Sequence, residues 1–161
     1  MTQISPNAAI SNAAIITLTE RSPANAQQPV QAVLALSAED RQRSRYRCQT
    51  TTGEELLLNL PRGTVLREGD LLTTPDQNWW VRVQAKPEPI FIVSAQQPLD
   101  LLRAAYHLGN RHVPLELTLQ TLKLSADPVL GEMLKHLGVE VSESLAPFSP
   151  EVGAYGHHHH E

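Results

Sequence analysis

Histidine is the residue type in this chain best suited to chemistry. The seven histidines are His107, His112, His136 and the adjacent run His157, His158, His159 and His160. Neutral imidazole is a good ligand for nickel, zinc and copper ions. Four adjacent histidines on a mobile tail can surround a metal ion without a preformed cage, so this run predicts metal binding.

The histidine run has two interpretations, a native metal-binding tail or an added affinity tag. Four histidines are fewer than a tag usually carries, and Glu161 follows them. The preceding residues, Gly153-Ala154-Tyr155-Gly156, do not resemble a vector linker. We therefore favour the native tail and keep the tag as the alternative.

The three isolated histidines carry less information by themselves. His107 lies near the C-terminal end of a predicted helix, where the helix dipole favours a solvated histidine. His112 follows that helix and precedes an apolar strand, a place typical of a structural histidine. His136 adjoins Lys135 and is expected at the surface.

Composition excludes several classes of protein. The single cysteine, Cys48, excludes an intrachain disulfide framework and any site built from several thiolates. A net charge of −4 argues against a nucleic-acid-binding protein. No apolar stretch is long enough for a membrane helix, and no basic segment precedes a signal-like run, so we expect a cytoplasmic protein without a membrane partner. No phosphate-binding glycine loop or paired nucleophile and base is present, so we expect no enzyme.

The first half of the chain reads as short strands between glycine and proline turns. Residues 1–12 are expected to be a flexible lead, and residues 13–86 a β-rich domain. Residues 41–48 are predicted to form a strand, because four arginines fall on every second position: Arg41, Arg43, Arg45 and Arg47. Such a row could bind an acidic partner or protect a sheet edge.

After the proline-containing residues 86–89, read as a linker, the pattern changes. Residues 90–146 are predicted to have the order β-α-β-β-α-β, which is ferredoxin-like. Pro98 and the pair Asp127-Pro128 are expected to open the two helices. Strands are predicted over residues 113–119 and 139–145. Residues 147–161 are expected to be a flexible tail. The predicted fold class is therefore α+β, with a small all-β domain first.

One segment resembles a known family. The sequence Ala105-Tyr106-His107-Leu108-Gly109-Asn110-Arg111-His112-Val113-Pro114-Leu115 is similar to the signature of UreE, the urease accessory nickel chaperones. Residues 40–63 are similar to the family's N-terminal domain, and residues 129–138 to its second C-terminal helix. Together the resemblance covers most of residues 38–160.

This resemblance implies a cytoplasmic homodimer that carries Ni(II) as cargo to the urease apoprotein, alongside other accessory proteins including the GTPase. It implies a peptide-binding-like N-terminal domain and a dimerising C-terminal domain. The family's principal metal ligand matches His112, which we expect to face its copy near a two-fold axis, and its tail ligands match residues 157–160. Zn(II) and Cu(II) are alternative ions for these ligands.

The sequence departs from the family in one place. Some members carry histidines between the third strand and second helix of the C-terminal domain, whereas residues 124–128 here contain none. Two other functions stay open: a nickel or zinc store, and a chaperone that binds protein without metal.

Overall fold

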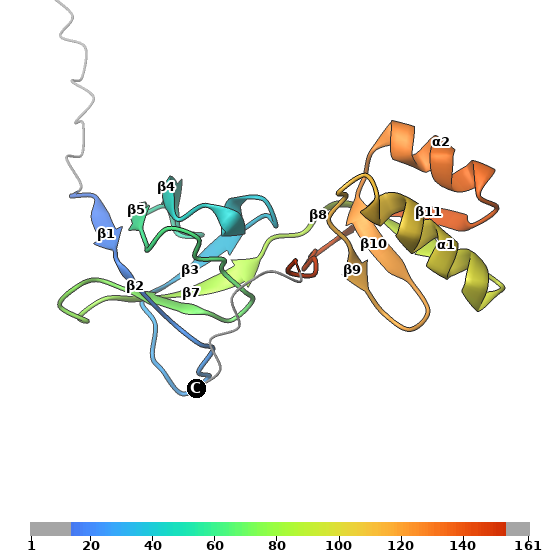
Figure 1. The fold of residues 1–161 in the computed structure, drawn as a ribbon. Helices are drawn as coiled ribbons and strands as arrows, with labels where there is room; N and C mark the ends of the chain where they lie inside the picture. The colour runs from blue at the N-terminus through green and yellow to red at the C-terminus, as the bar shows by residue number, and fades with distance from the viewer. Residues whose placement is uncertain (1–13, 154–161) are drawn as a thin grey trace, which may run out of the picture.

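The computed structural model describes residues 14–153, in two lobes joined by strand β8 (Glu88–Ser94) (Figure 1). The first lobe contains only strands and one short 3-10 turn, and the second contains both α-helices. The predicted fold class is therefore confirmed. The expected lead, residues 1–12, lies outside the described residues. No helix among the described residues is long and apolar enough to cross a membrane.

The N-terminal lobe is built from two small sheets. The first has the order β1-β5-β4, from β1 (Ile16–Leu18), β5 (Glu55–Asn59) and β4 (Arg45–Gln49). The second has the order β2-β6-β7-β3. Its strands are β2 (Glu20–Ser22), β6 (Leu71–Thr73), β7 (Trp80–Ala85) and β3 (Ala32–Leu36). Both sheets contribute to one aliphatic core of Leu18, Leu34, Leu36, Leu56, Leu58, Leu60, Leu66, Leu72, Val81 and Val83.

The arginine-rich segment differs from its prediction. A 3-10 turn, η1 (Asp40–Gln42), replaces the start of the expected strand, and β4 begins only at Arg45. The hydroxyl Oγ of Ser37 accepts a hydrogen bond from the Asp40 N–H at 3.1 Å. This local bond favours a turn over a strand. Arg41 is consequently buried, whereas Arg45 and Arg47 keep the expected exposed face.

The C-terminal lobe is an antiparallel sheet with the order β11-β8-β10-β9. It contains β11 (Glu140–Ala146), β10 (Leu122–Ser125) and β9 (Glu116–Leu117), with helices α1 (Pro98–Gly109) and α2 (Pro128–His136). Both helices share one core with the sheet: Val93, Leu101, Ala104, Leu108, Leu122, Leu124, Leu134 and Val139. The two helices therefore cover the same face of the sheet, as the ferredoxin-like order requires (Figure 1).

The boundaries of α2 follow from local chemistry. The Asp127 carboxylate accepts the Leu130 N–H at 2.9 Å, and Pro128 occupies the first turn. Gly131 lies against β8, where an added Cβ would come within 3.1 Å of the Phe91 ring. Gly138 follows the helix with φ of +74° and reverses the chain into β11.

Two strands of this lobe differ from their predicted lengths. Residues 113–119 were expected to form one strand, but β9 contains only Glu116 and Leu117. Pro114 lacks an N–H, and the Thr118 hydroxyl accepts the Thr121 N–H at 2.9 Å, which closes the hairpin early. β8 begins at Glu88, inside residues 86–89, which were expected to form a linker. Pro89 fits in this strand because β10 pairs with β8 only as far as Ile90.

A third, smaller core lies where the two lobes meet. Its buried members are Ala38 of the first lobe, Ile90 of β8 and Phe148, which follows β11. Phe148 is only 1% exposed. Residues 147–161 were expected to form one flexible tail, but Phe148 is packed in this junction core.

Candidate metal centre

His112 lies on the turn between α1 and β9. The helix ends at Gly109, and the N–H groups of Arg111 and Val113 both donate to the Leu108 carbonyl, at 3.0 and 3.2 Å. The His112 N–H donates to the Gly109 carbonyl at 2.9 Å. These bonds fix the backbone on both sides of an exposed imidazole.

The backbone of His112 adopts a left-handed conformation, with φ of +56°. A non-glycine residue there costs on the order of 1 kcal/mol, although histidine occurs in this region more often than most residues. The conformation turns the chain sharply, so the His112 side chain lies exposed at the bend. Such a projecting imidazole can bind a metal ion without rearrangement of a core.

The other two isolated histidines have local partners. His107 is half-buried on α1, and its ring packs edge-on against Tyr106 with centroids 5.5 Å apart. On α2, His136 is exposed, and its Nδ1 lies 2.7 Å from the Glu132 carbonyl. That contact leaves Nε2 as the available ring nitrogen. Neither residue lies on the turn that carries His112.

The histidine run, residues 157–160, lies outside the described residues. Within residues 14–153, no three His, Cys, Asp or Glu side chains gather into a group that could hold a metal ion. The expected grouping of His112 with residues 157–160 therefore stays a prediction.

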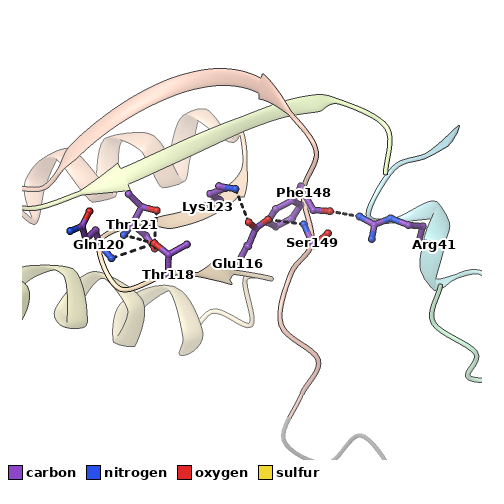
Figure 2. Close-up of polar contacts among 8 residues, drawn as sticks. All are labelled: Arg41, Glu116, Thr118, Gln120, Thr121, Lys123, Phe148 and Ser149. Atoms are coloured by element: carbon purple, nitrogen blue, oxygen red, sulfur yellow. Dashed lines mark hydrogen bonds and ion pairs between the residues drawn. The ribbon is translucent and has the colours of Figure 1, made fainter. Parts of the chain in front are cut away.

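The segment that leads to the tail, residues 147–153, is here called the strap. It leaves the junction core beside the start of β9, and its residues 149–153 line a cavity of about 620 Å³ together with residues 65–68 of the N-terminal lobe. The Ser149 N–H donates to the Glu116 carboxylate at 2.8 Å, and Lys123 pairs with that carboxylate at 2.6 Å (Figure 2). The Glu151 N–H donates to the Leu115 carbonyl at 2.7 Å. The strap is thus hydrogen-bonded to the strand that follows His112.

Arg41 holds the strap from the other side. Its guanidinium Nη2 donates to the carbonyl of Phe148 (Figure 2). The side chain is 4% exposed, and its Nε is buried without a hydrogen-bond partner in the described structure. The contact joins the N-terminal lobe to the strap, so the start of the tail is tied to both lobes.

Sequence reasoning did not identify Phe148 and Arg41 as fixed points of the tail. The period of the arginine row placed Arg41 on a solvated face. Phe148 had a weak signal, because it is one of only two phenylalanines in a chain with 4% aromatic residues. Its position near Pro147 and Pro150 instead favoured a flexible segment.

One face of α1 is apolar and uncovered. Leu99, Leu102 and Tyr106 are 55%, 66% and 67% exposed, at the spacing of one helix face. The opposite face buries Leu101 and Leu108 in the core. Soluble monomers rarely expose a continuous stripe of large apolar side chains, so this face is a candidate interface.

The single thiol lies away from the candidate centre. Cys48 is half-buried on β4, on the core side of that strand. Burial, with a smaller contribution from the Asp40 carboxylate, raises the pKa of the Cys48 thiol to about 11. A neutral thiol is a poor metal ligand, so the described donors are imidazole nitrogens rather than thiolate.

Two family models match the chain. The N-terminal domain of the UreE urease accessory protein matches residues 13–86, and its C-terminal domain matches residues 88–161. The urease accessory protein UreE of Nostoc punctiforme is 53% identical over 146 residues, covering 91% of this chain and 99% of the relative.

Proteins of the same name show similar identity in other organisms. The one from Thermosynechococcus vestitus is 50% identical over 144 residues, which cover 89% of this chain and all of the relative. The one from Burkholderia vietnamiensis is 52% identical over 126 residues, covering 78% of this chain and 62% of that longer relative.

Proposed function

Because the chain belongs to the UreE family of urease accessory proteins, we propose that it binds Ni(II) and delivers it for assembly of the urease active site. One observation carries the proposal. The exposed His112 lies three residues before Leu115, whose carbonyl binds the strap. The metal centre would consist of His112 and the tail histidines, residues 157–160. Zn(II) and Cu(II) would compete for these imidazoles.

Chain length supports a joint site. Three residues lead from Leu115 to His112, and six lead from Glu151, which is bonded to Leu115, to His157. An extended chain spans at most about 3.5 Å per residue, so these segments reach about 10 Å and about 20 Å. The chain is therefore long enough for the first tail histidine to reach His112 of the same chain, provided that residues 152–153 leave the N-terminal lobe, against which they lie.

The uncovered face of α1 supports a homodimer. Contact of Leu99, Leu102 and Tyr106 with their copies would bury this stripe in a two-fold interface. We place the axis near the C-terminal end of α1, so that both His112 side chains contact one nickel ion. Two imidazoles leave coordination positions free, and the tails of both chains can occupy them. A site with partly mobile ligands releases its metal more readily than a closed cage.

The cargo role defines the partners. We propose that the nickel-loaded dimer contacts the urease apoprotein and the other urease accessory proteins, including the GTPase. We propose the cytoplasm as the compartment, where the unpaired Cys48 would stay reduced.

Calorimetric nickel titration of variants tests the joint site. His112→Ala is expected to lose the tightest binding event and one nickel ion per dimer. His107→Ala is the matched control, because it removes an imidazole from the preceding helix while leaving the turn intact. Unchanged tight binding in His112→Ala, or an equal loss in both variants, would contradict the assignment.

A chain ending at Gly156 tests the tail. This truncation is expected to lower the affinity or stoichiometry for nickel, while light scattering still gives the mass of two chains. Nickel binding by the full chain is expected to weaken as the pH falls through about 6.5, because protonated imidazole does not bind metal. Identical titrations of both chains would show that the tail takes no part.

A further inference from the structure

Strand β4 forms one edge of its sheet. Among the described residues it pairs only with β5, in an antiparallel register that places Arg45 opposite Asn59. Beyond Gln49, the Thr51 N–H donates to the Val33 carbonyl at 2.9 Å, which closes the edge at that end. A short stretch of strand is therefore open to another chain.

Hydrogen bonds at both ends of β4 show which backbone groups are free. The Leu60 N–H donates to Ser44 O at 2.8 Å, and the Thr50 N–H donates to Glu54 O at 3.0 Å. Bonded positions alternate along an antiparallel strand, so the even-numbered residues of β4 bond to β5. Arg45, Arg47 and Gln49 therefore direct their N–H and C=O groups away from the sheet.

The side chains beside this free edge are cationic. Arg45 and Arg47 are exposed on the same sheet face, and neither forms an ion pair within residues 14–153. A hollow of about 390 Å³ lies at the start of the strand, lined by Gln42, Arg43, Ser44, Arg45 and Arg62. The positive charge is thus concentrated at the open edge of a chain whose net charge is −4.

The acidic residues nearby already have partners. Glu39 pairs with Arg43 at 2.6 Å, and Glu55 accepts a hydrogen bond from the Gln49 amide at 3.0 Å. These contacts leave Arg45, Arg47 and Arg62 as the cations of this edge without a carboxylate among the described residues. An incoming strand would meet these guanidinium groups first.

We propose that the free edge of β4 binds an extended segment of another protein that carries a carboxylate at every second residue. The backbone of that segment would bond to Arg45, Arg47 and Gln49, and its carboxylates would face the arginines, as opposite charges do across neighbouring strands. Guanidinium groups suit this role because they bind carboxylates in a bidentate geometry. This site needs no nickel and is independent of the metal centre.

Charged side chains also protect sheet edges against unwanted pairing. Edge protection and binding of an acidic strand differ in how they respond to reversal of the charge at Arg45 and Arg47. A glutamate at positions 45 and 47 would protect the edge as well as an arginine, because either charge resists aggregation. Only acidic-strand binding requires the positive sign.

The test uses the full chain and a blocked peptide of alternating valine and glutamate, with a valine–lysine peptide as the reference probe. The double variant Arg45→Glu/Arg47→Glu is expected to bind the acidic peptide about tenfold more weakly than the wild type. Arg67→Glu/Lys86→Glu is the matched control, because it reverses two exposed charges elsewhere and is expected to keep wild-type affinity. Arg45→Lys/Arg47→Lys is expected to retain most of the binding.

Amide hydrogen exchange separates strand addition from plain charge attraction. The bound acidic peptide is expected to slow exchange at Arg45 and Arg47, while Tyr46 and Cys48, already bonded to β5, stay unchanged. Equal binding to both glutamate double variants, equal binding of the acidic and basic peptides, or no alternation in the exchange pattern would overturn the proposal. The arginines would then serve as edge protection only.

Discussion

Replacement of Phe148 by alanine tests whether the strap is part of the folded structure. Phe148 is 1% exposed and packs with Ala38 and Ile90 in the core that joins the lobes. Phe→Ala substitutions in cores cost about 3–5 kcal/mol, and the small size of this cluster favours the lower end, about 3 kcal/mol. For a chain of this length, that loss corresponds to a fall in melting temperature of about 10 °C.

The same substitution is expected to change nickel binding very little. In the wild type, the anchored tether from Glu151 to His157 is six residues long. If the strap detaches, the next fixed point is Ala146, paired with Glu88, and the tether grows to eleven residues. Loop-closure entropy then disfavours the joint site by about 0.5 kcal/mol, which is about 2.5-fold in affinity.

Thermal and urea unfolding of the nickel-free chain, with calorimetric nickel titration, measure the two effects. Leu145→Ala is the matched control. Leu145 is a large apolar residue close to Phe148 in the sequence, but it is 70% exposed. We expect a change below about 0.5 kcal/mol for this control. A loss below about 1 kcal/mol in Phe148→Ala would refute the junction core. A tenfold loss of nickel affinity would refute the view that the strap acts only as a tether.

Three further predictions concern other parts of the molecule. The pKa of the Cys48 thiol is raised to about 11 in the folded chain, so alkylation of this thiol at pH 7.5 should be slow until urea unfolds the protein. For the same reason, the stability of the folded chain should fall as the pH rises toward 11. Fast alkylation of the folded chain would contradict the burial of Cys48. Asp127→Ala should lower the unfolding free energy by about 1 kcal/mol through loss of the α2 cap, with Glu143→Ala at an exposed position of β11 as the comparison. Tyr106→Glu should convert the proposed dimer to monomer by light scattering, whereas Lys135→Glu, at an exposed position on α2, should not.

Features with strong local signals were predictable from the sequence. Asp127-Pro128 and Gly138 gave the ends of α2, since capping and a left-handed glycine act within one turn. The helical spacing of α1 was equally clear. The spacing did not decide which face was buried, because Leu99, Leu102 and Tyr106 repeat as regularly as the buried residues opposite them.

Features that depend on distant contacts were not predictable. Arg41 shares the period of Arg45 and Arg47, but the Ser37 side chain starts a turn there, and the Phe148 carbonyl draws the guanidinium inward. The strap is tied to Leu115, more than thirty residues earlier in the chain. No local pattern encodes such a contact. Of the candidate ligands, only His112 has a described environment, and the tail histidines stay a prediction.

Transfer of nickel to urease tests the central claim most directly. Urease apoprotein, the other accessory proteins and a nickel chelator are mixed with nickel-loaded wild type or His112→Ala, and urease activity is followed. We predict activation by the wild type, and activity from His112→Ala no higher than that from free nickel with chelator. Activation by His112→Ala equal to that by the wild type would contradict a carrier site built on His112.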